Sequence, residues 1–256
     1  MPFILASWNV NFRRDVATQV AATLVHRPDI VVYQEVRAAS FPELAGRFAD
    51  AGLRHFASSS SSVDGYRMSR YVVVASRFPF GEAPAVEGPA PETSVCVDIE
   101  TPDGRFELVG VYVPSIARKD GVKVPTQHAM NARMVDAASR PHIICGDFNS
   151  PKAETPEGDI ELFFKPGRVA EYAGERALMH GLIERGLRDA FRATNGFAEP
   201  SPSWFWKNRG RTGGYRLDHI FVSHHFAVGQ CWYDHGVRER GLSDHSLMVA
   251  EVGIRA

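Results

Sequence analysis

The sequence contains little cysteine, with three such residues in 256. Cys96, Cys145 and Cys231 are far apart, odd in number and without a CxxC spacing, which argues against a disulfide framework and against a zinc site. Each cysteine stands in an apolar run, where a small buried core residue is typical. This usage fits a reducing compartment, so we expect a cytoplasmic protein.

The sequence also lacks membrane and export signals. No apolar run approaches the length of a membrane span, and the first residues, MPFILASWNVNFRR, place no basic region ahead of an apolar core. No internal repeat, long linker or oligomerisation signal is evident either. We therefore expect one domain over residues 1–256, present as a monomer, with no membrane contact and no protein partner.

Charge of neither sign is in excess. Lys and Arg total 29 and Asp and Glu total 30, for a formal net charge of −1. A protein that binds polyanions through a generally basic surface carries a large positive charge. The balance argues against that class, but it leaves room for an enzyme that meets phosphate at one local basic site.

What the sequence does contain is a series of short apolar runs separated by turn signals. Helical spacing of apolar residues predicts helices at 14–26, 41–52, 126–139 and 174–186. Apolar runs predict strands at 3–8, 28–35, 70–77, 93–100, 105–114, 142–145, 216–223, 228–234 and 246–254, and the polar stretch 58–65 predicts a flexible loop. Many strands, few helices and hairpin-like connections favour mixed sheets packed face to face with helices outside, rather than a doubly wound parallel sheet.

Polar side chains recur at the ends of these predicted strands. The stretch HIICGDFNSP (142–151) ends a short buried strand with Asp147 and Asn149, two residues apart. A turn alone would explain Gly, Asp, Asn and Pro in such a stretch. Similar groups flank other strands: Asn9 and Asn11, Gln34 and Glu35, Tyr112, Asp218 and His219, and Ser243, Asp244 and His245. Side chains gathered at strand ends on a rigid scaffold are typical of an active site.

Hydrolysis of a phosphodiester needs this kind of set. Mg²⁺ takes oxygen ligands and often only one or two carboxylates, which suits Glu35 and Asp244. The attacking water needs a base or an orienting group, which suits Asp147 or a His–carboxylate pair. Charge that grows on phosphoryl oxygens needs neutral or cationic donors, and the candidates are Asn9, Asn149, Tyr112 and His245.

Each of these residues, taken alone, also has an ordinary structural explanation. Asn9 and Asn11 can cap the helix that follows them, and Tyr112 can be a packed ring with a hydrated hydroxyl. Asp218 and Asp244 can be turn acids. The occurrence of the whole set in one chain favours the catalytic interpretation over six separate structural ones.

Six segments, in the order SWNVN, VVYQEV, GVYVPS, IICGDFNSP, YRLDHIFVS and LSDHSLMV, resemble the endonuclease/exonuclease/phosphatase superfamily. The resemblance extends from about Phe3 to Val252, and the stretch 202–223 is most similar to the exonuclease III and abasic-site endonuclease branch. It implies the DNase I-like fold, a four-layer α/β sandwich of two mixed β-sheets flanked by helices. It also implies a metal-dependent phosphodiester hydrolase that uses Mg²⁺ or Mn²⁺.

The resemblance further implies a role for each motif. Glu35 would be the principal metal ligand, and Asn11 and Asp244 would lie near the metal, directly or through water. Among the catalytic groups, Asp147 would orient or deprotonate the attacking water, and Asn9 and Asn149 would position Asp147 and the phosphate. Tyr112 would contact the phosphate. His245 would hydrogen-bond the phosphate or act as the base, and Asp218 would orient His245. Gly146 is expected to let the chain turn sharply so that Asp147 and Asn149 face the same phosphate.

The segment SWFWKNRGRTGGYR (203–216) is the best local evidence for a nucleic-acid substrate. It interleaves aromatic and cationic side chains, as surfaces that contact phosphate and stack on bases do. The residues expected to bind substrate are Trp204, Trp206, Lys207, Arg209, Arg211 and Arg216. A second basic set, Arg118, Lys119, Lys123 and Arg133, is expected to extend the same face. The other explanation of 203–216 is a structured loop whose aromatics pack under a sheet while its cations are solvated.

Three hypotheses follow for the function. The first is a DNA nuclease of the abasic-site endonuclease or 3′-exonuclease type, which the segment 202–216 favours. The second is a phosphoesterase of the same fold that acts on a small molecule, a lipid headgroup or a DNA-end adduct. The neutral charge balance favours this second hypothesis, as does Val36-Arg37, which stands where the abasic-site branch usually has Thr-Lys. The third, a catalytically inactive binding module, is disfavoured because the whole set of catalytic groups is present.

Overall fold

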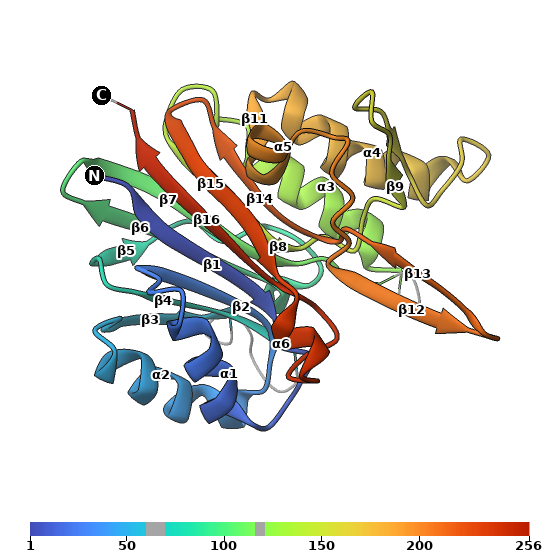
Figure 1. Ribbon diagram of the computed structural model, residues 1–256. Helices are drawn as coiled ribbons and strands as arrows, with labels where there is room; N and C mark the ends of the chain where they lie inside the picture. The colour runs from blue at the N-terminus through green and yellow to red at the C-terminus, as the bar shows by residue number, and fades with distance from the viewer. Residues whose placement is uncertain (60–69, 116–120, 256) are drawn as a thin grey trace.

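The computed structural model describes residues 1–59, 70–115 and 121–255, whose strands form two six-stranded mixed sheets and two small hairpins (Figure 1). The first sheet has the order β15-β16-β1-β2-β4-β3, with bounds Phe226–Asp234, Leu247–Ile254, Phe3–Asn9, Ile30–Val36, Tyr71–Ser76 and His55–Ser58. The second has the order β11-β14-β8-β7-β6-β5, with bounds Leu187–Asp189, Asp218–Ser223, His142–Asp147, Gly104–Tyr112, Ser94–Thr101 and Phe80–Glu82. The loop expected at 58–65 lies largely outside the described residues.

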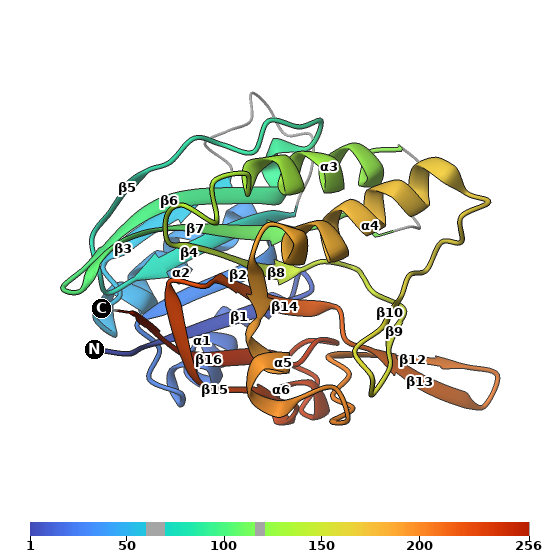
Figure 2. The ribbon, with the colours of Figure 1, turned by 90° about the horizontal axis from the view of Figure 1, so that it is seen from above.

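Helices cover the outer face of each sheet, which gives four layers (Figure 2). α1 (Val16–Leu24) and α2 (Phe41–Asp50) pack on the first sheet, and α3 (Lys123–Arg133) and α4 (Val169–Glu184) pack on the second. Two shorter helices are α5 (Ala190–Asn195) and α6 (Gly236–Glu239). The four-layer α/β sandwich predicted from the sequence is confirmed. Within the described residues, no helix is long and apolar enough to cross a bilayer.

The main core lies between the two sheets. Fully buried β-branched and leucine side chains fill it from both sides, among them Leu5, Val32 and Val74 from the first sheet and Leu108, Ile143 and Ile220 from the second. Gly110 of β7 lies where the sheets approach closely, since a Cβ there would sit 2.7 Å from Val32 Cγ1. Two of the three cysteines, Cys145 and Cys231, belong to this core, as predicted.

Two parallel strand pairs bring the polar strand ends to one edge of the sandwich. β1 and β2 run parallel and place Asn9 opposite Gln34 at their carboxyl ends, next to Glu35. β7 and β8 run parallel and place Tyr112 opposite Asp147. β14 runs antiparallel to β8 and begins there, so that Asp218 also lies opposite Asp147. Because the sheets face each other, both sets of strand ends open onto the same space.

The segment 203–216 forms a hairpin, which the sequence analysis did not predict. β12 (Trp204–Asn208) and β13 (Arg211–Tyr215) pair antiparallel, and the hairpin projects from the body of the sandwich (Figure 1). The two turn residues, Arg209 and Gly210, both have positive φ, of 46° and 77°. Positive φ at both central residues is the geometry of the tight turn that matches strand twist. A second small hairpin joins β9 (Ala153–Glu154) and β10 (Ile160–Glu161).

The predicted elements are all present, with shifted boundaries in some cases. The largest shift is in the helix predicted at 126–139, which spans Lys123–Arg133 and is followed by turns at 134–139. Pro125 lies in its first turn, where a proline costs no intrahelical hydrogen bond. The short edge strands β3 and β5 were not predicted, because neither carries the apolar run used to identify the others.

Candidate active site

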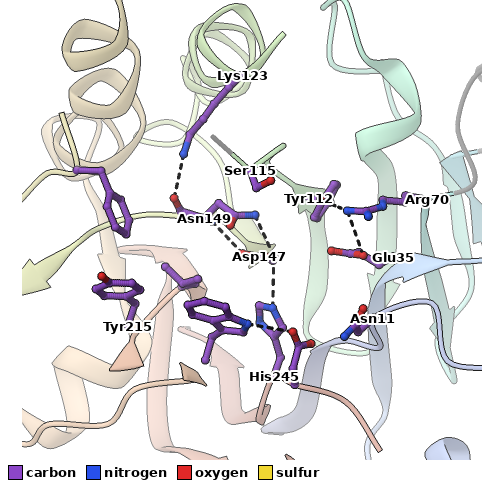
Figure 3. Close-up of a pocket in the computed structure, with 14 residues that line it drawn as sticks. Asn11, Glu35, Arg70, Tyr112, Ser115, Lys123, Asp147, Asn149, Tyr215 and His245 are labelled. Atoms are coloured by element: carbon purple, nitrogen blue, oxygen red, sulfur yellow. Dashed lines mark hydrogen bonds and ion pairs between the residues drawn. The ribbon is translucent and has the colours of Figure 1, made fainter. Parts of the chain in front are cut away.

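The converging strand ends surround a cavity of about 430 Å³ (Figure 3). Eight of the predicted site residues line it: Asn11, Glu35, Tyr112, Asp147, Asn149, Trp204, Asp244 and His245. The remaining lining residues are Arg70, Ser115, Lys123, Phe163, Tyr215 and Leu217. Asn9 and Asp218 are buried behind the wall and hydrogen-bond to residues that face the cavity. The tertiary structure therefore brings together residues that are as many as 236 positions apart in the sequence (Asn9 to His245).

Asp147 is held in one orientation at the end of β8. Asn9 Nδ2 donates to its Oδ2 at 2.9 Å, and the backbone N–H of Asn149 donates to its Oδ1 at 2.9 Å. Asn149 is fixed in turn by a 2.8 Å bond from its Nδ2 to the carbonyl of Val113. The carboxylate is 1% exposed, so these bonds replace most of the hydration it would have in water.

The expected sharp turn at Gly146 is wrong. Gly146 lies within β8 and pairs in register with Val111. Its φ is +145°, and a Cβ would lie 1.9 Å from the backbone oxygen of Val111. The glycine is required by this close approach of two backbones, and the chain turns after Asp147 instead.

Burial raises the pKa of Asp147 to about 7. The carboxylates of Asp218 and Glu35 add to this rise, while His245 and the Asn149 N–H oppose it. A carboxylate with a raised pKa is a stronger base than one in water. In this environment Asp147 is suited to accepting a proton near neutral pH.

His245 and Asp218 form a buried pair beside Asp147. His245 Nδ1 donates to Asp218 Oδ2 at 2.8 Å, and His245 Nε2 points toward Asp147 Oδ2 at 3.9 Å. Burial lowers the pKa of His245, but Asp218 and Asp147 outweigh it and raise the pKa to about 10. His245 is therefore a cation at neutral pH, with Nε2–H directed into the cavity. This state favours a donor to phosphate over a general base.

The oxygen-rich side of the cavity fits a hard divalent cation. Glu35 Oε1 accepts from Asn9 at 3.1 Å, and Asn11 is placed by a 2.9 Å bond from its backbone N–H to Asn9 Oδ1. Asp244 Oδ2 accepts from Trp204 Nε1 at 3.0 Å, while its Oδ1 is buried and has no hydrogen-bond partner among the residues that the structure describes. A buried carboxylate oxygen without a partner is costly unless a cation or water meets it. The donor set of carboxylates and one amide is the type that Mg²⁺ prefers.

A second group of ligand atoms lies close together. Single ligand atoms of Asp147, Asp218 and His245 all fall within 4.8 Å of one another, and all three residues are buried. The 2.8 Å contact between His245 and Asp218 is a hydrogen bond, which a shared cation would have to replace. These three residues are a second candidate place for a cation, and Glu35, whose side chain is 11% exposed, is more accessible than any of them.

Two cations line the cavity without having been predicted as catalytic, metal-binding or substrate-binding residues. Arg70 donates to the Tyr112 hydroxyl at 2.9 Å and lies 3.4 Å from Glu35 Oε2. Lys123 donates to the carbonyl of Asn149 at 3.0 Å. Burial lowers the pKa of Lys123, against the effect of Glu175 and Asp147. Lys123 was named in the second basic set. No motif in the sequence indicated Arg70, which lies directly before a buried strand.

An aromatic wall closes the other side of the cavity. Trp204 and Tyr215 stack at 6.1 Å across the base of the β12–β13 hairpin, and Phe163 meets Tyr215 edge-on at 5.0 Å. The Trp204 indole N–H bonds to Asp244, so this wall is joined to the oxygen-rich side. Trp204 was predicted to bind substrate, and its cavity position is consistent with that. Phe163 was missed because its loop carries no motif.

The other predicted substrate-binding residues of the hairpin differ in their exposure. Lys207, Arg209 and Arg211 are exposed toward its tip, whereas Trp206 packs its ring over Gly213. Arg216 is a correction, because its side chain is 5% exposed and faces inward. It donates to Glu154 Oε2 at 2.7 Å and to Asp189 Oδ2 at 2.8 Å. A guanidinium buried between two carboxylates is not available to a substrate.

The two described members of the second basic set, Lys123 and Arg133, lie at opposite ends of α3. Arg133 pairs with the buried Glu107 and donates to the Pro84 carbonyl at 3.0 Å, at the end of α3 away from the cavity. Lys123 faces the cavity from the other end of the same helix. Arg118 and Lys119 lie outside the described residues. Of the two members that the structure describes, Lys123 alone lines the cavity.

The chain matches the Endonuclease/Exonuclease/phosphatase family over residues 6–245, and it belongs to this family. It is 26% identical to exodeoxyribonuclease III of Haemophilus influenzae over 245 residues, which cover 89% of each protein. Its fold is similar to that of the 3′ phosphatase NExo from Neisseria bound to a product DNA hairpin, with a TM-score of 0.68 and 20% identity over 99% of this chain and 100% of that one. It is also similar to an AP endonuclease from Archaeoglobus fulgidus, with a TM-score of 0.70 and 18% identity over 99% of this chain and 100% of that one.

These matches confirm the superfamily and the metal-dependent phosphodiester hydrolase predicted from the six ordered segments. At identities of 18% and 20%, the two solved structures show a shared fold.

Proposed function

We propose that the protein is a Mg²⁺-dependent phosphodiesterase that hydrolyses DNA, of the abasic-site endonuclease or 3′-exonuclease type. The observation that carries this proposal is the arrangement around Asp147. Asn9 and Asn149 fix its carboxylate, and a His245–Asp218 pair faces it across 3.9 Å. A fixed base and a fixed cationic donor side by side at the cavity wall can orient the attacking water and stabilise charge on the phosphate that it attacks.

In this proposal each group keeps the position already described. Asp147 orients the attacking water and takes its proton, which its raised pKa favours. His245 donates from Nε2–H to a phosphoryl oxygen, and Asp218 holds the imidazole and stabilises its charge. Tyr112 supplies a neutral donor to another phosphoryl oxygen. Asn149 positions Asp147, because its Nδ2 donates to the Val113 carbonyl at 2.8 Å and to Asp147 Oδ2 at 3.2 Å.

Glu35, Asp244 and Asn11 would hold the divalent cation. A Mg²⁺ ion bound there would act as a Lewis acid and would stabilise negative charge on the phosphate and on the oxygen of the leaving group. Glu35 lines the cavity from the end of β2, and Asp244, whose Oδ1 has no hydrogen-bond partner among the described residues, lines it as well. Asn9 links Glu35 to Asp147 through one amide group, so the cation ligand and the base are positioned together.

DNA is supported by the aromatic wall and the hairpin. Trp204 and Tyr215 offer ring surface beside the catalytic groups, while the exposed cations of the hairpin lie beyond them, along the path of a polymer. The relatives support the same class, because one is an exodeoxyribonuclease and one was solved with a DNA hairpin.

A second candidate is a phosphoesterase that acts on a DNA-end adduct or a small phosphodiester. The cavity favours it, since about 430 Å³ bounded by Phe163, Trp204 and Tyr215 is the size of a small-ligand site. The two candidates share the same catalytic groups and differ in what the aromatic wall contacts.

The test is a gel assay with Mg²⁺ and three substrates: a duplex with an abasic site, an intact recessed-end duplex and a single strand. Glu35→Ala and Asp147→Asn should each lower cleavage by about 10³-fold or more, since they remove a cation ligand and the base. Glu82→Ala and Asp159→Asn, which alter exposed acids away from the cavity, are the matched controls. Excess EDTA should stop the reaction.

The outcomes separate the candidates. Metal-dependent cleavage lost in both variants supports the nuclease, and the preferred substrate identifies its type. No cleavage of DNA by a folded protein that hydrolyses bis-p-nitrophenyl phosphate favours the second candidate. Undiminished cleavage by a folded Asp147→Asn protein contradicts the role given to Asp147.

A further inference from the structure

Arg70 reaches the site from the start of β4. Its Nη1 donates to the Tyr112 hydroxyl oxygen at 2.9 Å and lies 3.4 Å from Glu35 Oε2, so one guanidinium bridges two site residues from different sheets (Figure 3). Its side chain is 39% exposed, which leaves part of the guanidinium facing the cavity.

The Phe12 ring holds Arg70 in this place. The Arg70 guanidinium lies over that ring at 4.5 Å from its centroid. Arg37, the cation that directly follows β2, lies over the same ring at 5.3 Å and donates to the Phe12 carbonyl at 2.7 Å. Arg37 therefore contacts Phe12 through both its hydrogen bond and its cation–π contact. Among the described arginines and lysines, it is Arg70 that forms the ion pair with Glu35.

The bond from Arg70 determines which way the Tyr112 hydroxyl donates. A phenol oxygen has one proton to donate and accepts through its lone pairs, whereas a guanidinium can only donate. Since Tyr112 accepts from Arg70, its own proton is directed elsewhere, and the cavity is the open side. The positive charge also polarises the O–H bond and makes it a stronger donor.

We propose that Arg70 is a positioning residue that directs the Tyr112 hydroxyl toward a phosphoryl oxygen and restrains the Glu35 carboxylate. The proposal rests on the proposed phosphodiesterase function. Arg70 acts through Tyr112, and the side chains of the two residues form a single functional unit. The positive charge of Arg70 also repels a divalent cation at Glu35. Arg70 therefore increases turnover through Tyr112 and weakens the affinity for the cation.

A double-mutant cycle tests the coupling. Arg70→Met keeps most of the side-chain volume and removes the guanidinium, and Tyr112→Phe removes the hydroxyl. With bis-p-nitrophenyl phosphate, each single variant should lower kcat by about 10- to 100-fold with a smaller change in KM. The double variant should be no slower than the slower single variant, because both changes remove the same donor. Arg70→Lys should recover only part of the loss, since an ammonium is a single point charge.

Cation affinity gives a readout that does not depend on turnover. Mn²⁺ titration followed by EPR should show several-fold tighter binding to Arg70→Met than to the unaltered protein, because a positive charge near Glu35 is gone. If Arg70 only supported the fold, Glu35 would be misplaced and Mn²⁺ would bind more weakly. Arg77→Met is the matched control, since Arg77 lies beyond the other end of β4 and pairs with Asp29 at 3.0 Å.

Additive losses in the double variant, or weaker Mn²⁺ binding to Arg70→Met, would overturn the proposal. These results are distinct from failure of the proposed function. A folded, unaltered protein that hydrolyses no phosphodiester would overturn the function itself, whereas an active protein with additive losses would overturn the role of Arg70 alone.

Discussion

Glu35 combines a strained backbone with the position that a metal ligand needs. Its φ is 55°, and Asn11 and Asn149, which line the same cavity, have φ of 47° and 46°. Asparagine tolerates this left-handed region, but glutamate adopts it at a cost of about 1 kcal/mol or more. The pairing of β2 with β4 shifts register between Tyr33 and Val36, and this bulge aims Glu35 into the cavity.

At the residue scale, Asp218→Asn should disable the His245 pair without unfolding the protein. The Asp218 carboxylate raises the pKa of His245, so replacing it by a neutral amide should lower that pKa. NMR titration of the imidazole in the metal-free protein measures the change. Turnover should fall by about 10²-fold or more, because the donor loses its charge and orientation. An unchanged His245 pKa would contradict the assignment of Asp218.

Gly146→Ala should destabilise the fold by about 3 kcal/mol or more, because a Cβ would overlap the Val111 backbone at a φ of +145°. Urea denaturation measures this change directly. Gly81→Ala is the matched control, because Gly81 is also in a strand and its φ is not in the left-handed region. A Cβ added there would meet no atom of the described residues within 4 Å. Equal stability losses at the two positions would show that the close approach is not the cause.

At the element scale, a buried ionic cluster joins four segments next to the site. Glu154 of β9 accepts a hydrogen bond from Arg192 of α5 at 2.7 Å and another from Arg216, which precedes β14. Asp189, the last residue of β11, accepts a hydrogen bond from Arg216 at 2.8 Å and is bonded to His219 at 2.9 Å. Arg216 is two residues from Asp218, so the cluster stabilises the start of β14, where the His245 partner lies.

The cluster predicts a loss of stability in acid. Burial by itself raises the pKa of Glu154, but Arg216 and Arg192 outweigh burial and lower the pKa from 4.5 to about 2. The unfolded chain therefore binds the proton more tightly, and stability present above pH 4.5 is lost as the pH falls toward 2. The loss should amount to about 3 kcal/mol.

Urea denaturation between pH 6 and about pH 2.5 should show that slope. The Glu154→Gln variant should be less stable at neutral pH and should lose part of the slope, since it has no proton to bind at that position. Glu157→Gln, an exposed glutamate in the neighbouring turn, is the control and should retain the slope. A Glu154→Gln protein with the full slope would show that other carboxyl groups cause the acid effect.

At the scale of the whole molecule, charge is arranged locally. The net charge of −1 gives no general attraction to a polyanion, yet Lys207, Arg209 and Arg211 are exposed together on one projecting hairpin (Figure 1). A phosphate-binding strip beside the cavity can orient a polymer without making the whole surface basic.

Replacing Lys207, Arg209 and Arg211 together by Gln should raise KM for DNA and leave kcat for bis-p-nitrophenyl phosphate unchanged. If all three contact phosphates, the slope of log affinity against log salt should fall by up to about 3 for duplex DNA. The matched control replaces Arg27, Arg54 and Arg105, which are exposed cations elsewhere, and has the same net charge. Equal effects of the two triple variants would indicate general charge rather than the hairpin.

Much of the site could be predicted because its residues follow strands in recognisable segments. Asp147, Asn149, Asp218 and His245 each lie in such a segment, and the structure brings all four together. Arg70 and Phe163 could not be predicted in this way, since each lies next to ordinary sequence and reaches the cavity by packing. Arg216 was misassigned because a cation in a basic, aromatic segment gives no sign of buried carboxylates far along the chain.

The sequence by itself determined the alternation of strands and helices, the four layers and the identity of most polar groups at the strand ends. Apolar periodicity and turn residues are local, so they can be read without the fold. The tertiary structure alone decided the placement of Arg70 against Glu35 and Tyr112 and the burial of Arg216. These depend on strand register and on the packing of one sheet against the other, because distance in space and exclusion of water set the strength of each interaction.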